Sequence, residues 1–253
     1  MEEEEQVDTR IGTVDIPDRT DREKFFRELS YLELSALFAG PLKPSALQKW
    51  AELAPPGHIG LVAPWVLTHR KPPTATKLWA HDATVGDFRD SAPGRVALAE
   101  FKTAVETLGA AYTIFKSPPL FAPSAANRDQ LARFFGELAT EEACGAPRVW
   151  IPDGLWETRS AVAFATEHDL ICAFDPLVID PNQPNEIYFD LDVTQLYLRP
   201  ENLGRAGTMR DEQLEQLAIL LEQYGETFAT IAFASPARWQ DARSFKKLLV
   251  EGT

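Results

Sequence analysis

A short apolar run that stops abruptly at one or two polar residues or a proline recurs about seven times along this chain. Stretches with helical periodicity lie between most of these runs. A strand that is buried on both faces reads as a continuous apolar run, because helices cover the outer side of its sheet. The runs therefore predict buried parallel strands. They are Tyr31–Ser35, Ile59–His69 (in two parts, IGLVAP and VLTH), Tyr112–Pro119, Arg148–Asp153, Leu170–Pro176, Gln195–Pro200 and Thr230–Pro236.

The number of strands favours a closed barrel. With Arg10–Asp15 as a first strand, the chain has eight. Alternating strands and helices require a parallel sheet with right-handed crossovers, and eight such units in about 250 residues are typical of a (β/α)8 barrel. An open doubly wound sheet is the competing arrangement. It is disfavoured because no glycine-rich dinucleotide or phosphate loop follows the first strand. We therefore predict an α/β fold, a TIM-barrel-like (β/α)8 barrel.

The spacing of apolar residues predicts the helices of this barrel, with one exception. Between Asp175 and Val193 three prolines and two asparagines exclude the expected helix. The sequence thus predicts a long irregular loop in place of the helix between strands six and seven. The predicted helices are Ser45–Leu53, Val96–Leu108, Asn127–Leu138, Glu157–Thr166, one capped by Asp211 and a last one carrying Phe245 and Leu248.

Composition limits the partners and the compartment of the protein. The 253 residues carry a formal net charge of −13, which disfavours nucleic acid as a partner because phosphate backbones would be repelled. No apolar run approaches the length of a membrane span, and the start MEEEEQVDTR does not resemble a signal peptide. The two cysteines have no metal-like or redox-like spacing, so we expect a cytoplasmic protein. We predict an acidic disordered tail over residues 1–9 and one domain over residues 10–253.

The strand-end phrases resemble those of the YecE-like family, a widespread bacterial domain of unknown function built on a TIM barrel. The resemblance covers the chain from about Ile11 to Leu249. YLEL is similar to the family's V-E-I-N phrase and APWVLTH to its A-P-x-x-I-T-H phrase. FKSPPLF is similar to F-Q-L-P-P-S-F, and YLR to the start of Y-V-R-L-H-G. The order and spacing of these phrases along the chain support the resemblance more than any single phrase does.

Most polar residues of the family pattern are replaced in this chain. The E-F-R-H-x-x-W phrase is reduced to Trp150–Trp156, without its glutamate, arginine and histidine. The histidine and glycine after Arg199 become Glu201 and Asn202, and the paired asparagines of the eighth strand become Ala234-Ser235. The resemblance therefore implies a divergent, degenerate member of the family, a possible pseudoenzyme.

In a TIM barrel the carboxyl ends of the strands form the active face. Glu33 and His69 are the candidate catalytic residues, with His69 as an acid or base and with Glu33, inside its strand, expected to point into the barrel mouth and to orient His69. Arg199 is a candidate anion ligand and a candidate partner of Glu33. For His69 a structural histidine, hydrogen-bonded at a strand end, is the favoured alternative, whereas for Glu33 a structural ion pair is as open as a ligand-binding one. The further candidate ligand-binding residues are Lys116, Ser117, Asp153, Asp175 and Ser235.

Three functional hypotheses follow. The favoured one is a non-catalytic protein with a pocket at the barrel mouth for a small anionic ligand, or with a role in contacts with a protein partner. The alternative is a metal-independent hydrolase or lyase that uses His69, Glu33 and Arg199. The third is a partner-binding protein that acts through the acidic tail or the Pro-Asn-rich loop. No cofactor and no metal site is expected, because the chain lacks zinc-ligand spacing, a P-loop and a nucleophile elbow.

Overall fold

The fold is a closed barrel of parallel strands. The computed structural model describes residues 9–18, 20–152, 156–178, 188–204, 206–225 and 227–251. Within these ranges eight strands follow one another around the barrel in chain order, which confirms the predicted (β/α)8 architecture. Every predicted strand starts within one residue of an observed one, except for the VLTH part of the second run. The strands are β1 (Arg10–Val14), β2 (Tyr31–Leu34), β3 (Ile59–Val62), β4 (Tyr112–Lys116), β5 (Arg148–Ile151), β6 (Ile171–Phe174), β7 (Leu196–Leu198) and β8 (Ala229–Phe233).

The chain divides into two compact units. Unit 1 consists of Met1–Leu32 together with Ala173–Thr253, and unit 2 is Glu33–Cys172. Each unit is described by itself.

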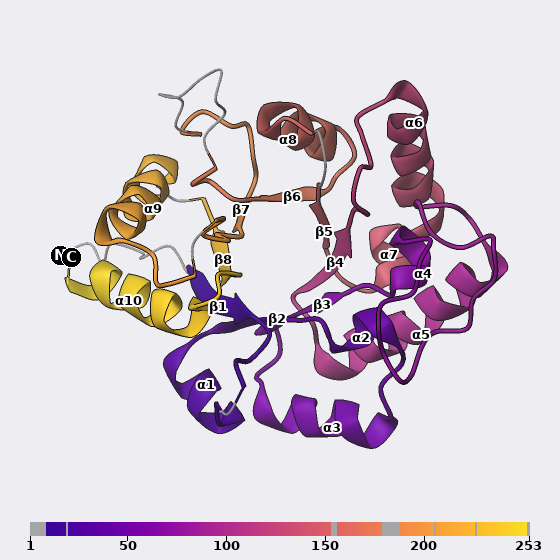
Figure 1. The fold of residues 1–253 in the computed structure, drawn as a ribbon, viewed down its shortest axis with the longest axis horizontal. Coiled ribbons are helices and arrows are strands. Elements are labelled where there is room, and N and C mark those ends of the chain that lie inside the picture. Colours follow the sequence, from indigo (N-terminus) through magenta and orange to yellow (C-terminus); the bar gives the residue numbers. More distant parts are fainter. Residues whose placement is uncertain are drawn as a thin grey trace. The chain divides into compact units, whose positions relative to one another are not determined.

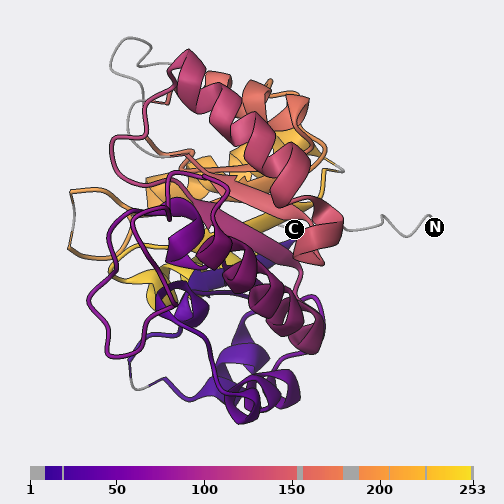
Figure 2. The same cartoon turned by 90° about the vertical axis from the view of Figure 1, so that its right-hand side faces the viewer.

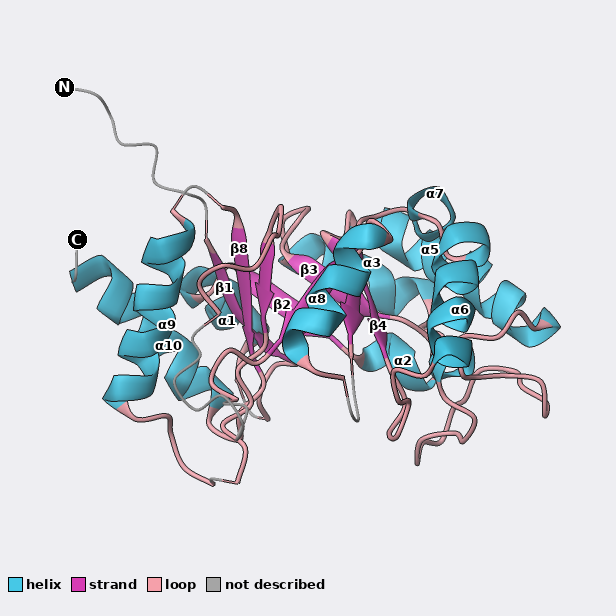
Figure 3. Ribbon diagram, turned by 90° about the horizontal axis from the view of Figure 1, so that it is seen from above, coloured by secondary structure: helices cyan, strands magenta, loops and turns pink. Residues whose placement is uncertain are grey.

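In unit 1, β1 pairs with β8, β8 with β7, and β7 with β6, all in parallel. Its helices are α1 (Arg22–Glu28), α9 (Asp211–Tyr224) and α10 (Arg238–Glu251). Helix α10 packs against α9, β1 and β8 (Figure 1), and Figure 3 shows α9 and α10 side by side. Between β6 and β7 the described residues, 175–178 and 188–195, contain no helix, and the rest of the predicted loop, residues 179–187, lies outside the described residues.

In unit 2, β3 pairs with β4, β4 with β5, and β5 with β6, again in parallel. Figure 2 shows the long helices of this unit in front of its strands. Helix α5 (Ala92–Leu108) begins at a serine cap, where the Ser91 hydroxyl accepts the Gly94 N–H at 3.2 Å, and it ends at Gly109 in the left-handed conformation. The helices are α2 (Ala36–Ala39), α3 (Pro44–Leu53), α4 (Trp65–Thr68), α5 (Ala92–Leu108), α6 (Ala125–Arg133), the π-helix η1 (Phe134–Leu138), α7 (Glu141–Cys144) and α8 (Thr158–Glu167).

Three predictions need correction, one of a strand and two of helices. The VLTH run is not the end of a strand, because it forms most of α4, a single turn whose four residues are all buried. A fully buried helical turn and a buried strand give the same apolar run. The helix predicted over Asn127–Leu138 changes into a π-helix at Phe134, and Arg210 rather than Asp211 is the cap of α9. The short helices α1, α2 and α7 were not predicted.

The π-helix contributes Phe134 and Phe135 to a buried aromatic cluster of unit 2, which also contains Phe88 and Phe115. Phe134 and Phe135 are adjacent in sequence, yet both are almost fully buried. Their rings lie 5.1 Å apart, and both contact the rings of Phe88 and Phe115 at centroid distances of 5.3 to 5.9 Å. The π turn closes with the hydrogen bond from the Ala139 N–H to the Phe134 carbonyl at 2.7 Å.

Candidate functional site

The predicted site residues fall in both units. Unit 1 contains Asp175, Arg199 and Ser235, and unit 2 contains Glu33, His69, Lys116 and Ser117. Asp153 lies outside the described residues.

In unit 1 the backbone joins three neighbouring strand ends. The Arg199 N–H donates to the Phe174 carbonyl at 2.8 Å, which extends the pairing of β7 with β6. The Ala234 N–H donates to the Pro200 carbonyl at 2.9 Å, which extends the pairing of β8 with β7. The residues that follow these strands are therefore held at one edge of the sheet, as the topology predicted.

Asp175 ties the end of β6 to the end of β7. Its Oδ1 accepts the N–H of Leu177 at 2.9 Å, the local turn that an aspartate before a proline favours. Its Oδ2 accepts the N–H of Glu201 at 2.9 Å. Burial raises the pKa of the Asp175 carboxyl; the two N–H donors oppose this effect, and the neighbouring Glu201 carboxylate adds to it.

Arg199 forms an ion pair with Glu201, two residues further along the chain. The Arg199 side chain is 12% exposed and the Glu201 side chain 37% exposed. The guanidinium is thus mostly buried, whereas its carboxylate partner is supplied from the solvent side by the loop after β7. Asn202, the next residue, has a φ of 54° and is buried. Asparagine is among the residues that best tolerate this left-handed conformation.

Ser235 belongs to a buried network at the end of β8. Its hydroxyl donates to Oδ2 of Asp241 on α10, while Oδ1 of Asp241 accepts the N–H of Met209 at 2.9 Å. Ser235 is 0% exposed and Asp241 1% exposed. The network fastens the loop between β7 and α9 to the end of β8.

In unit 2, Glu33 lies within β2 and is 1% exposed. His69 directly follows α4, and its backbone N–H donates to the Trp65 carbonyl at 2.7 Å. The His69 Nδ1 lies 2.7 Å from the Thr68 hydroxyl, and the ring meets that of Phe38 edge to face. These contacts fix the ring on two sides. The acid or base role of His69 stays a prediction.

Ser117 lies at the end of β4 and is completely buried. Its hydroxyl accepts the indole N–H of Trp150 at 2.9 Å, and its own N–H donates to the Ile151 carbonyl at 3.0 Å. Ser117 therefore fixes a core tryptophan across the β4–β5 pair. Lys116 precedes it and is half-buried. Anion binding by either residue stays a prediction.

Three further observations concern metal ligands, the two cysteine thiols and membrane-spanning helices. Within the described ranges, no three His, Cys, Asp or Glu side chains are grouped as metal ligands. Burial raises the pKa of the Cys144 thiol to about 12 and raises that of Cys172 as well. No helix among the described residues is both long and apolar enough to span a membrane.

Two charged residues that the sequence did not single out complete the unit 1 site, namely Glu201 and Asp241. Glu201 was noted only as a departure from the family phrase. Its spacing of two residues from Arg199, across a proline, is the signal that could have identified the pair. Asp241 lies in a helix and has no sequence signal, because its partners Ser235 and Met209 are distant in the chain.

Comparison with known proteins supports the fold. No protein-family model matches the sequence, and no curated protein matches it. The structure is similar to that of a DUF72 family protein from Enterococcus faecalis, with a TM-score of 0.66 and 11% identity over 96% of this chain and 94% of that one. It is also similar to a DUF72 family protein from Thermotoga maritima, with a TM-score of 0.64 and 15% identity over 96% of this chain and 99% of that one. At such identities the likeness establishes a shared fold.

Proposed function

We propose that this chain is a divergent YecE-like, or DUF72, barrel protein that binds a small carboxylate at the ends of β6, β7 and β8 without turning it over. The similar structures and the strand-end phrases support the family assignment. The left-handed Asn202 at the position of a family glycine supports the alignment around Arg199.

The ion pair between Arg199 and Glu201 carries the proposal of carboxylate binding. A mostly buried guanidinium requires an anionic partner, because leaving a buried charge unpaired is costly. Here a loop side chain on the solvent side supplies that partner. Glu201 thus occupies the place of a ligand carboxylate, and a ligand displaces it by offering the same planar acceptor to the arginine fork.

The absence of turnover is proposed because the neighbouring groups are already engaged. Asp175 accepts two backbone N–H groups, and its fixed orientation serves the loop. Ser235 and Asp241 are buried together and hold the loop after β7. A nucleophile or base has to reach a substrate, and neither Ser235 nor Asp241 is exposed to one.

The test compares binding of small carboxylates, with acetate, benzoate and succinate as probes, to the wild type and three variants. Glu201→Gln removes the competing carboxylate and is expected to bind the preferred probe about tenfold more tightly. Arg199→Met is expected to lose binding at this site. Lys247→Gln, on α10 and paired with Glu251, removes one positive charge elsewhere in unit 1 and is the control. Thermal shift and calorimetry give the affinities.

Equal binding by Glu201→Gln and the wild type would show that Glu201 does not occupy a ligand position, and unchanged binding by Arg199→Met would remove the site. Hydrolysis of an ester, glycoside or phosphoester panel that disappears in His69→Ala would instead establish the hydrolase alternative.

A further inference from the structure

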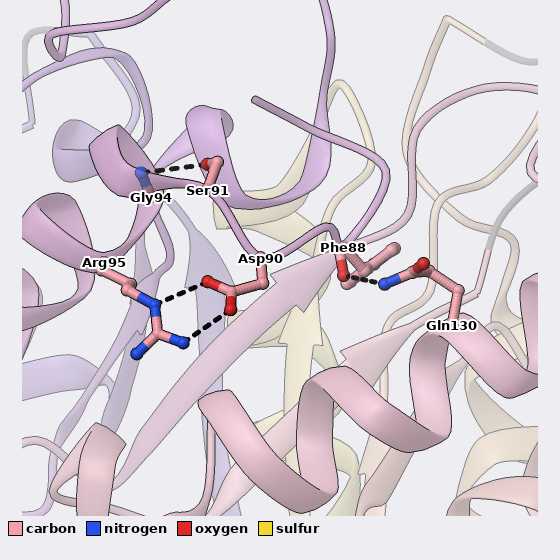
Figure 4. Close-up of polar contacts among 6 residues, drawn as sticks. All are labelled: Phe88, Asp90, Ser91, Gly94, Arg95 and Gln130. Carbon is pink, nitrogen blue, oxygen red and sulfur yellow. Dashed lines mark hydrogen bonds and ion pairs between the residues drawn. The ribbon is translucent and has the colours of Figure 1, made fainter. Parts of the chain in front are cut away.

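A cleft of about 400 Å³ lies in unit 2, apart from every residue of the predicted site. Its lining residues come from the segment that leads into α5, from the start of α5, from α6 and from η1. Figure 4 shows Gln130 of α6 directed at Phe88 of this segment. The volume of the cleft is within the range of small-molecule sites. The lining residues are Phe88, Arg89, Asp90, Arg95, Gln130, Arg133, Phe134, Glu137 and Leu138.

Phe88, one of the lining residues, ends a turn held in an unusual conformation. Gly86, Asp87 and Phe88 have φ values of 85°, 53° and 57°, and the latter two are not glycines. Their N–H groups cap the last carbonyls of α4, on Val66, Thr68 and Leu67. Gln130 on α6 donates to the Phe88 carbonyl at 2.7 Å (Figure 4). Residues kept in sparsely populated conformations are concentrated at functional sites, so the turn independently supports a function for the cleft.

This turn also fixes Arg89 in place. The Arg89 Nε donates to the Gly86 carbonyl at 3.1 Å, and its Nη2 donates to the Val85 carbonyl at 2.5 Å. Within the described part of the chain, the remaining three of its five N–H groups have no protein acceptor. A guanidinium oriented by carbonyls but lacking a carboxylate partner is preorganised to bind a planar anion.

The other charges of the cleft leave a net excess of positive charge. Arg95 makes two hydrogen bonds to Asp90, at 2.7 and 2.5 Å, so these two charges neutralise each other (Figure 4). Arg133 is exposed, and among the described residues its side chain donates only to the Asp129 carbonyl, at 3.3 Å. Glu137, one helical turn further along, is the opposing carboxylate. Two positive charges, on Arg89 and Arg133, and one negative charge, on Glu137, thus remain in the cleft, although the net charge of the whole chain is −13.

We propose that this cleft is a second binding site, specific for a small organic carboxylate. Arg89 holds the carboxylate through its preoriented fork, and Arg133 closes on it from α6. A bare inorganic anion fills little of the volume, so the ligand carries an organic body that extends toward Leu138. The proposal is independent of the site at Arg199, which lies in unit 1.

Benzoate is the probe, benzamide its neutral isostere and inorganic phosphate the bare anion, with calorimetry in low salt as the assay. Benzoate is expected to bind more tightly than either of the others. Arg133→Gln is expected to weaken benzoate about tenfold, and Glu137→Gln to strengthen it, because the first removes an attraction and the second a repulsion. Lys102→Gln on α5 removes one positive charge outside the cleft and is expected to change nothing. Because Arg133 is exposed, Arg133→Gln is expected to fold. It therefore tests the proposal even if a variant at the half-buried Arg89, such as Arg89→Gln, does not fold.

The same titration in Arg199→Met separates the two sites. Benzoate binding that persists in Arg199→Met and weakens in Arg133→Gln belongs to the cleft. The proposal is overturned if benzoate does not bind to Arg199→Met, if benzamide binds equally well, or if Arg133→Gln binds as the wild type does.

Discussion

Replacing Arg148 by methionine is expected to lower the free energy of unfolding by about 3 kcal/mol. Arg148 is 7% exposed at the start of β5, and its guanidinium donates to three carbonyl oxygens. Nη1 donates to Phe135 at 2.8 Å and to Ala139 at 3.3 Å, and Nη2 donates to Asp169 at 3.0 Å. The variant leaves three carbonyl groups without this donor, at roughly 1 kcal/mol for each bond. The variant also removes the desolvation cost of burying the cation. The expected loss per hydrogen bond is therefore at the lower end of the range for charged donors.

Urea unfolding followed by circular dichroism measures this loss, and the melting temperature is expected to fall by about 6–12 °C. Arg148→Lys retains a donor and is expected to lose less. Arg133→Met removes an exposed arginine and is expected to stay within about 0.5 kcal/mol of the wild type. If Arg148→Met melts with the wild type, other donors satisfy these carbonyls and the reasoning is wrong. Because Phe135 and Ala139 flank Glu137 and Leu138, the same bonds support one wall of the cleft.

Three further predictions concern buried polar groups. Ser117→Ala is expected to cost about 1–2 kcal/mol, because the Trp150 indole N–H loses its acceptor inside the core; equal urea midpoints for variant and wild type would contradict this. The raised pKa of Asp175 means that the folded state binds its proton more tightly than the unfolded state, so this group's contribution to stability falls as pH rises through the ordinary aspartate range and up to the folded pKa. Stability measured against pH should therefore show this fall in the wild type and lose it in Asp175→Asn. Cys144 and Cys172 are expected to resist iodoacetamide in the native protein and to react after denaturation, as mass spectrometry would show, because burial raises both thiol pKa values.

The strands and most helices could be predicted because their signal is local. A strand covered by helices must be apolar along its whole length. Leu170–Phe174 and Thr230–Phe233 can therefore be recognised in the sequence whichever strands they pair with. The same logic failed at Val66–Thr68, because a buried helical turn is equally apolar. It also missed the change to a π-helix at Phe134, since two adjacent buried phenylalanines do not by themselves specify the helix type.

The site shows the same division. The sequence by itself determined that polar residues follow the strands and that Asp175, Arg199 and Ser235 share one edge, because parallel strands bring their carboxyl ends together. Only the tertiary structure decided what those residues contact. Asp241 reaches Ser235 from a helix, and Arg89 and Arg133 line one cleft although a strand and most of two helices separate them in the chain. Contacts between side chains distant in sequence depend on how helices pack on the barrel, which hydrophobic periodicity does not encode.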